Sequence, residues 1–256
     1  MASPPPEYPP PRGLLAGKTV LVTAAAGTGI GFATAKRCAE EGASVAISDK
    51  HERRLGESAA ELAKVLGRDP VAVPCDVTVE DDVQRLFDTV GDVDVLVNNA
   101  GLGGTAELVD MTDEQWSSVL DVTLTGVMRC TRAALRRMLP RGSGVIVNNA
   151  SVIGWRAQAG QAHYAAAKAG VMALTRCAAI EAAPSGVRIN AVAPSLAMHA
   201  NLAKVTTDEL LTELTSREAF GRAAEPWEIA NVIVFLASDL SSYMTGEVIS
   251  VSSQHP

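Results

Sequence analysis

Short apolar runs alternate with longer amphipathic segments along almost the whole chain. The apolar runs have the length of strands buried on both faces, and they cover residues 19–23, 44–48, 71–74, 93–97, 144–149, 187–192 and 247–251. Segments with helical periodicity separate them, at 29–42, 51–66, 79–90, 112–139, 161–183 and 226–237. Strands that alternate with helices pair in parallel, so the pattern predicts an α/β protein built on one parallel sheet.

The number of these units indicates the architecture. About six strand-helix repeats and a final strand predict a Rossmann-like, doubly wound parallel sheet of about seven strands, with helices on both faces. A chain of 256 residues with 47% hydrophobic side chains suits one domain, expected over residues 14–256. The proline-rich residues 1–13 predict a mobile, extended tail. The irregular stretch at about 195–222 is expected to be an insertion at a strand tip, where substrate clefts lie in such folds.

Charge and targeting signals narrow the class of partner. The net charge is −7 and the isoelectric point is near 5.2, which argues against a nucleic-acid partner, because phosphate backbones are bound by basic surfaces. No apolar run reaches eighteen residues, and the N-terminus lacks the layout of a signal peptide, so we expect a cytoplasmic protein without a membrane partner. The four cysteines form no C-x-x-C pair, and the sequence predicts no metal site.

A glycine-containing segment, T-A-A-A-G-T-G-I-G, runs from Thr23 to Gly31 between the first strand and the first helix. Glycines at this place let backbone amides approach a diphosphate, and the helix dipole favours its negative charge. A tight strand-to-helix turn without a ligand is the alternative. The residues predicted to contact a dinucleotide are Ala25, Gly27, Thr28, Gly29, Ile30 and Gly31.

Asp49 ends the second strand, eighteen residues after Gly31. A carboxylate at that place can accept hydrogen bonds from both hydroxyls of an adenosine ribose, and it would repel an additional phosphate. NAD is therefore favoured over NADP as the cofactor. The neighbouring cations Lys50, Arg53 and Arg54 leave NADP open.

Three polar residues have a spacing that suits proton transfer. Tyr164 and Lys168 lie four apart, so they share one face of the predicted helix, and Ser151 follows the strand before it. An ammonium one turn away is expected to stabilise the tyrosine phenolate, and a serine hydroxyl can hold a carbonyl or alcohol oxygen. The alternative is that the pair is only a solvated helix face. The functional interpretation is a site that interconverts an alcohol and a ketone.

Together these residues resemble the ordered motifs of the short-chain dehydrogenase/reductase family. The motifs extend from Leu14 to Val251 and are Gly29-Ile30-Gly31, Asp76-Val77, Asn98-Asn99-Ala100-Gly101, Ser151, Tyr164, Lys168 and Asn190-Ala191-Val192-Ala193-Pro194. The resemblance implies that Asp76 and Val77 border the adenine and that Lys168 also holds the nicotinamide ribose. It further implies that the cofactor channel is lined by Asn99, Ala100, Gly101, Tyr164, Pro194 and Leu196. A homodimer or homotetramer is also implied.

The chain departs from the family pattern at several points. The glycine segment is one residue longer, with alanines where the first glycine would stand. Thr123 replaces the asparagine of the family's proton relay, and we expect its hydroxyl to keep a water chain in altered geometry. Simple helix packing of Thr123 is the alternative. Ser195 follows Pro194 in place of glycine, His199 stands where a threonine is common, and the chain ends in S-S-Q-H-P.

These departures together resemble a subgroup of the family that takes part in actinobacterial steroid degradation. That resemblance implies a ring secondary alcohol as substrate, carried as an acyl-CoA and interconverted with the ketone. The candidate substrate residues are Trp155, Arg156, Met198 and Leu202, although Met198 and Leu202 have the spacing of ordinary helix packing. A 3-oxoacyl-thioester reductase is one alternative, and a sensor that binds NAD without turnover is another.

Overall fold

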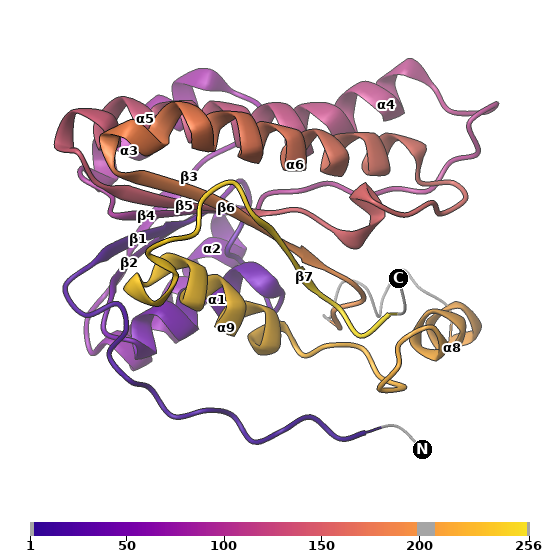
Figure 1. Cartoon of the computed structure of the whole chain (residues 1–256), viewed down its shortest axis with the longest axis horizontal. Helices are drawn as coiled ribbons and strands as arrows, with labels where there is room; N and C mark the ends of the chain where they lie inside the picture. The colour runs from indigo at the N-terminus through magenta and orange to yellow at the C-terminus, as the bar shows by residue number, and fades with distance from the viewer. Residues whose placement is uncertain (1–2, 199–207, 255–256) are drawn as a thin grey trace.

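A seven-stranded parallel sheet forms the centre of the molecule (Figure 1). The computed structural model describes residues 3–198 and 208–254. The strand order is β3-β2-β1-β4-β5-β6-β7, and every neighbouring pair is parallel. The strands are β1 (Thr19–Val22), β2 (Ser44–Asp49), β3 (Val71–Pro74), β4 (Val95–Asn98), β5 (Gly144–Asn149), β6 (Val187–Pro194) and β7 (Val248–Val251). The predicted doubly wound sheet is confirmed.

Helices cover both faces of the sheet (Figure 1). On one face lie α1 (Ile30–Glu40), α2 (Glu52–Leu66) and α9 (Pro226–Ala237). On the other lie α3 (Glu80–Val90), α4 (Asp113–Leu120), α5 (Gly126–Arg141) and α6 (Ala162–Ala182). In the part of the chain that the structure describes, none of these helices is both long and apolar enough to cross a membrane.

The strand side chains explain why both faces are covered. Val20 and Val22 point into the core beneath α1 and α9, whereas Leu21 between them packs on the side of α3 and α5. All three are fully buried. A strand that is apolar at every position must be covered on both faces, because alternate side chains emerge on opposite sides. The parallel arrangement also places the carboxyl ends of all strands along one edge.

The predicted helix over 112–139 is wrong in its middle. A π-helical turn, η1 (Asp121–Thr125), separates α4 from α5. The turn adds a residue to the helical repeat, and Gly126 directly after it packs against Val77, where a Cβ would come within 2.6 Å of that side chain. The hydrophobic periodicity of the sequence does not reveal the one residue that a π-helical turn adds. The stretch predicted to be irregular likewise contains a helix, α8 (Asp208–Ser216).

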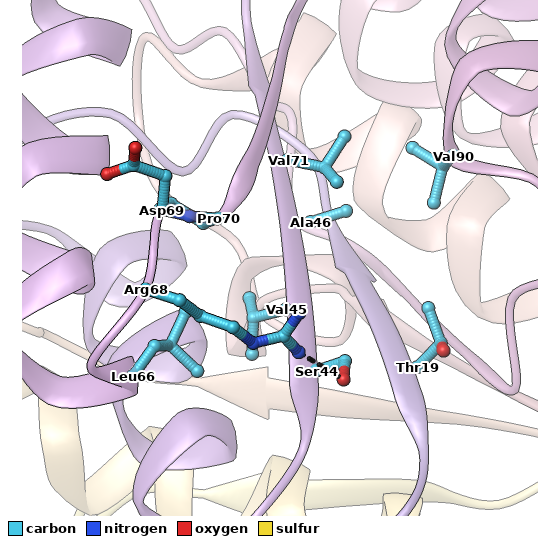
Figure 2. Close-up of a pocket in the computed structure, with 10 residues that line it drawn as sticks. All are labelled: Thr19, Ser44, Val45, Ala46, Leu66, Arg68, Asp69, Pro70, Val71 and Val90. Atoms are coloured by element: carbon cyan, nitrogen blue, oxygen red, sulfur yellow. Dashed lines mark hydrogen bonds between the residues drawn. The ribbon is translucent and has the colours of Figure 1, made fainter.

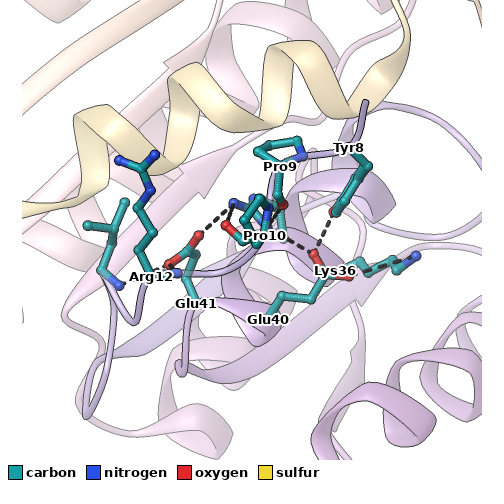
Figure 3. A network of polar contacts seen from close by, with 9 residues as sticks. Tyr8, Pro9, Pro10, Arg12, Lys36, Glu40 and Glu41 are labelled. Carbon is teal, nitrogen blue, oxygen red and sulfur yellow. Dashed lines mark hydrogen bonds and ion pairs between the residues drawn. The ribbon is translucent and has the colours of Figure 1, made fainter. Parts of the chain in front are cut away.

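The N-terminal segment runs beside α1 without helix or strand (Figure 3). The Arg37 guanidinium of α1 donates to the carbonyls of Pro9 and Pro10, at 3.1 and 3.4 Å, and the Tyr8 hydroxyl donates to Glu40. The Tyr8 ring meets Trp227 of α9 edge-on, with the ring centroids 5.3 Å apart. The segment has these partners on the body of the protein, and the mobile tail stays a prediction.

Candidate active site

Ser151, Tyr164 and Lys168 meet at the carboxyl edge of the sheet. Ser151 follows β5 and caps a short 3₁₀ turn, η2 (Val152–Gly154), by accepting from the Ile153 N–H. Tyr164 and Lys168 lie in the first two turns of α6, and a hydrogen bond joins the Tyr164 and Ser151 side chains. The structure thus brings together the three residues whose spacing suggested proton transfer.

Lys168 is buried, with 3% of its surface exposed. Its ammonium donates to the backbone carbonyl of Asn149 at 2.6 Å and lies 5.5 Å from the centre of the Tyr164 ring. Burial disfavours the charged form and lowers the pKa of Lys168 to about 8. This lysine therefore changes charge close to neutral pH.

The expected direction of the tyrosine shift is not what this structure shows. Burial raises the pKa of the Tyr164 phenol, and the hydrogen bond from Ser151 lowers it by less. The sequence argument counted on the Lys168 ammonium to stabilise the phenolate. In the structure that ammonium is directed at the Asn149 carbonyl, so desolvation dominates.

A pair of asparagine doublets connects the strand ends around this site. Asn98 and Asn148 are register partners on β4 and β5, and the Asn98 amide donates to the Asn148 oxygen at 2.9 Å. The next residues repeat the pattern, because the Asn149 amide donates to the Asn99 oxygen at 3.0 Å. Sequence reasoning missed Asn149. The repeated Asn-Asn at the ends of two neighbouring strands was the available signal.

The glycine segment has an unusual backbone. Ala24, at the place of the family's first glycine, has a φ of +48°, and Gly27 has a φ of +98°. The Ala24 carbonyl accepts from the Asn99 amide at 2.9 Å, while the Gly27 N–H donates to the Ser58 hydroxyl of α2 at 3.0 Å. The segment is thus joined to α2 by a hydrogen bond.

The segment retains the features that a dinucleotide requires. Helix α1 starts after Gly29 with no side chain capping it, so its amides can receive a diphosphate. A Cβ on Gly31 would come within 2.5 Å of the Ala24 carbonyl, so only glycine fits there. The Asp49 carboxylate accepts from the N–H groups of Ala26 and His51, one to each oxygen, which leaves acceptor capacity for ribose hydroxyls.

The remaining predicted cofactor residues follow β3, β4 and β6. The Asp76 carboxylate is engaged by Thr78 in the turn before α3, and Val77 next to it is buried. Ala100 donates its N–H to Thr23, and a Cβ on Gly101 would lie 3.6 Å from the Lys168 ammonium. Pro194 and Leu196 line the cavity described below, as do Ile30, Ser151 and Tyr164.

Thr123 lies in the π-helical turn η1 and is fully buried. Its hydroxyl accepts from the Leu102 N–H at 2.9 Å and donates to the Leu102 carbonyl at 3.1 Å. The hydroxyl therefore does not bond a carbonyl of its own helix, as simple helix packing would have it. It fastens the loop after β4 beside Lys168.

A cavity of about 520 Å³ opens in front of Ser151 and Tyr164. Its apolar wall includes Ile153, Leu196 and Leu214, and two cations, Arg156 and Arg217, reach it. Of the three predicted substrate residues that the structure describes, Arg156 lines it. Trp155 is half exposed and Met198 lies on the strand-tip segment, neither among the lining residues. Leu202 and His199 lie outside the described residues.

A second hollow lies at the opposite edge of the sheet (Figure 2). It is bounded by the starts of β1, β2 and β3, where the Arg68 guanidinium donates to the Ser44 hydroxyl at 2.6 Å. Its volume is about 70 Å³, too small for a dinucleotide. Of these two hollows, the one at the carboxyl edge has the larger volume.

Comparison with known proteins agrees with this geometry. A family model described as enoyl-(acyl carrier protein) reductase, one of the models for short-chain dehydrogenases/reductases, matches residues 24–253. The chain belongs to the short-chain dehydrogenase/reductase family. It is therefore an oxidoreductase with a nicotinamide cofactor site.

Relatives within the family are similar over nearly the full length. A (5R,7aS)-5-hydroxy-7a-methyl-1-oxo-2,3,5,6,7,7a-hexahydro-1H-indene-carboxyl-CoA reductase of Mycobacterium tuberculosis is 66% identical, over 96% of this chain and 95% of the relative. A cis-4-hydroxycyclohexanecarboxylate dehydrogenase of Sinomonas cyclohexanicum is 42% identical, over 91% and 94%. The crystal structure of a short chain dehydrogenase from Mycobacterium smegmatis superposes with a TM-score of 0.85, at 60% identity and 98% coverage of both chains.

Proposed function

We propose that the protein interconverts a ring secondary alcohol and its ketone with NAD(H), acting on a hydroxy-hexahydroindanone-type steroid catabolite carried as a CoA thioester. The observation that carries the proposal is that Ser151 and Tyr164 line a cavity with an apolar wall, while Lys168 is buried one helical turn after Tyr164. The two curated relatives add support, since both are named for ring compounds that bear a hydroxyl and a carboxyl group.

In the oxidising direction, the Tyr164 oxygen would take up the hydroxyl proton of the substrate and pass its own phenol proton to the relay at Lys168, since burial keeps the phenol protonated, while the carbinol carbon would give up a hydride to the cofactor. The Ser151 hydroxyl, which is fixed at the end of β5, holds the substrate oxygen at the same time. Lys168, one helical turn after Tyr164, would hold the ribose of the cofactor. A bound NAD supplies the hydride acceptor. Reduction of the ketone uses the same groups in reverse.

Thr123 acts in this proposal as part of the proton relay behind Lys168. Its single hydroxyl hydrogen is directed to the Leu102 carbonyl, so toward a relay water it can only accept. The water would thus donate to Thr123, whereas an asparagine amide could also donate to the water. Trp155, Met198 and Leu202 remain candidate substrate contacts, and Arg156 is the one that the cavity supports.

NAD rather than NADP is proposed because Asp49 lies beside the glycine segment and would repel a 2′-phosphate. The test compares kcat/KM for the two cofactors in the parent protein and in Asp49→Ala. The parent should favour NAD, and the variant should narrow the difference by losing the charge conflict. Equal or better efficiency of the parent with NADP would refute this part.

The assembly and the location are also part of the proposal. The outer side of α6 leaves Ile180 77% exposed, and α4 leaves Trp116 37% exposed. Apolar side chains on neighbouring helices favour a homodimer or homotetramer. A cytoplasmic location fits the four free cysteines, which carry no disulfide.

The decisive experiment follows NADH absorbance with NAD and three substrates: a hydroxy-hexahydroindanone carboxyl-CoA, its free acid and a 3-hydroxyacyl thioester. We expect turnover of the ring substrate and a fall of about 10²–10⁴-fold in kcat for Tyr164→Phe, because a positioned proton donor contributes that much. NADH should still bind the variant. Preference for the linear thioester would favour the 3-oxoacyl-thioester reductase, and NAD binding with no turnover of any substrate would favour a sensor.

A further inference from the structure

A buried carboxylate lies behind the substrate cavity. Glu218, just after α8, is 4% exposed, yet no lysine or arginine pairs with it among residues 3–198 and 208–254. Neutral donors satisfy it instead: the Leu196 N–H at 3.3 Å, the Ser253 hydroxyl at 2.7 Å and the Gln254 amide at 2.9 Å. One acidic side chain thus joins the strand tip after β6 to the C-terminal segment after β7.

Gln254 connects this carboxylate to the cavity. Its amide nitrogen donates to Glu218, and its oxygen accepts from the Arg156 guanidinium. The orientation of the amide is determined by its partners, since a carboxylate only accepts and a guanidinium only donates. A backbone bond from the Ala219 N–H to the Ser253 carbonyl, at 2.8 Å, fixes the segment that carries Gln254.

Arg156 is held in this way without being neutralised. Its backbone N–H closes the turn that begins at Val152, so the side chain starts one turn after Ser151. Within the described ranges no carboxylate pairs with it, whereas Arg217, the other cation at the cavity, pairs with Glu213. The guanidinium has five N–H donors, so an amide partner leaves it further donors and its full positive charge at the cavity that it lines.

We propose that Gln254 and Glu218 are positioning residues that present Arg156 to the carboxyl-derived group of the ring substrate. The group recognised is an oxygen acceptor, either a thioester carbonyl or a free carboxylate. By binding that group, Arg156 would hold the substrate with its ring hydroxyl at Ser151 and Tyr164. The site would then select rings that carry a carboxyl-derived group and a hydroxyl at the matching distance. The inference rests on the proposed function, and it adds a specificity device formed by the last described residues of the chain.

The experiment measures KM and kcat for a ring alcohol bearing a CoA thioester, the same ring with a free carboxylate, and cyclohexanol, which has no carboxyl group. Gln254→Ala should raise KM for the thioester, the acid or both by about tenfold, the effect of losing a charge-assisted contact. The substrate whose KM rises, thioester or free acid, identifies the group that Arg156 contacts. The kcat for each carboxyl substrate, and kcat/KM for cyclohexanol, should stay within about twofold of the parent values. Equal losses on all three substrates would overturn the proposal.

Two further variants test whether the rise in KM comes only from a loss of structure. The double change Gln254→Glu with Glu218→Gln exchanges amide and carboxylate, so the bond between the two side chains can re-form in the reverse direction, while Arg156 becomes directly paired with a carboxylate. Only the 3.3 Å bond from the Leu196 N–H loses its acceptor. We therefore expect the Tm to fall by no more than a few degrees and the KM for the carboxyl substrates to stay raised; full recovery of KM would contradict the need for an unneutralised guanidinium. Gln84→Ala, which removes a similar amide-carboxylate contact to Glu80 on α3, is the matched control and should change nothing.

A binding measurement separates this proposal from the proposed function. Calorimetry of the NADH complex with cyclohexanecarboxylate and with cyclohexanecarboxyl-CoA requires no turnover. If the parent binds either ligand and Gln254→Ala binds it about tenfold more weakly, the positioning role holds even for a protein that oxidises none of the alcohols. Unchanged affinity in the variant would refute the positioning role of Gln254 and would leave the proposed function unaffected.

Discussion

Ala24 is the one described non-glycine residue with a positive φ. At +48° its Cβ crowds the following carbonyl oxygen, which costs an L-residue about 1–2 kcal/mol. The Asn99 amide on its carbonyl and the Ala25 N–H bond to Ser48 hold the backbone there. The strain lies directly beneath the amides expected to receive the diphosphate.

We therefore expect Ala24→Gly to stabilise the protein. Removing the strain returns about 1–2 kcal/mol, and the greater freedom of glycine in the unfolded chain offsets about 0.5–1 kcal/mol of it. Thermal melting should show a Tm higher by a few degrees. The control is Ala25→Gly, at a buried position with ordinary φ, which should lower the Tm. A lower Tm for Ala24→Gly would mean that its methyl packing outweighs the strain.

Lys168 provides a pH-dependent property of the cofactor site. Its pKa of about 8, lowered by burial, means that the ammonium is present below pH 8 and lost above it. If the ammonium holds the ribose, the affinity for NADH should fall about fivefold between pH 7 and pH 9.5, since charge-assisted hydrogen bonds exceed neutral ones by about 1 kcal/mol. Fluorescence titration measures this. Lys168→Met should bind more weakly with a flat profile; a parallel decline in the variant would assign the titration to another group.

The meeting of the three candidate residues could be predicted because their spacing is local. Tyr164 and Lys168 share a helix face by spacing alone, and Ser151 follows a recognisable strand. The residues around them were not predictable in the same way. Asn149, Glu218 and Gln254 make contacts with residues 36 to 98 positions away in the chain, and the direction of the tyrosine shift depends on where the Lys168 ammonium points.

Among the elements, the π-helical turn η1 has a clear effect on the position of a neighbouring loop. It directs Thr123 toward Leu102, so that one hydroxyl bonds both the N–H and the carbonyl of that residue. The loop after β4 is thereby fixed where Gly101 approaches Lys168. A regular helix over the same residues would present side chains at a different angle.

Thr123→Val should lower both the stability of the protein and its turnover rate. The isosteric change leaves two backbone groups of Leu102 without their partner, which costs about 1–3 kcal/mol and lowers the Tm by several degrees. Turnover should fall because the relay behind Lys168 loses its acceptor, with little change in NADH affinity. Thr123→Ser keeps the hydroxyl and is the control. A Val variant with parental kcat would show that Thr123 only anchors the loop.

Periodicity recovered the strands and most helices because burial on both faces leaves an unbroken apolar run. It could not recover η1, since one additional residue in a helix leaves the apolar stripe almost unchanged. It also missed α8, which lies at the rim of the cavity and is not part of the central core. Elements stabilised by a local rim environment carry a weaker pattern than those that cover the sheet.

At the scale of the whole molecule, Glu41 joins the N-terminal segment to the body (Figure 3). Its fully buried carboxylate accepts from the N–H groups of Arg12 and Leu14, at 2.9 and 3.0 Å, and pairs with Arg37 at 2.7 Å. Burial by itself would raise the pKa of the Glu41 carboxyl, but these donors together outweigh it, and the pKa lies below its ordinary value of 4.5.

Glu41→Gln should lower the free energy of unfolding near pH 7 by about 1–3 kcal/mol, because the charge on which the donors converge is lost. A depressed pKa contributes stability above the unfolded value and loses it as the pH falls through the folded one. The gap between parent and variant should therefore be constant above pH 5 and close under more acid conditions. Denaturant titrations across pH test this. Glu57→Gln, from an exposed pair with Arg53, should cost at most about 0.5 kcal/mol.

The two end segments of the described chain reach the same short stretch beside α8. The Ser3 N–H donates to the Phe220 carbonyl at 2.9 Å, and the Ser253 carbonyl accepts from Ala219 at 2.8 Å. Two positions 250 residues apart in sequence thus attach to consecutive residues, so a short linker can join them. The fold is suited to circular permutation, with new ends opened at the exposed turn after α2 around Gly67. Such a permutant would keep Gln254 beside Arg156 through a covalent connection.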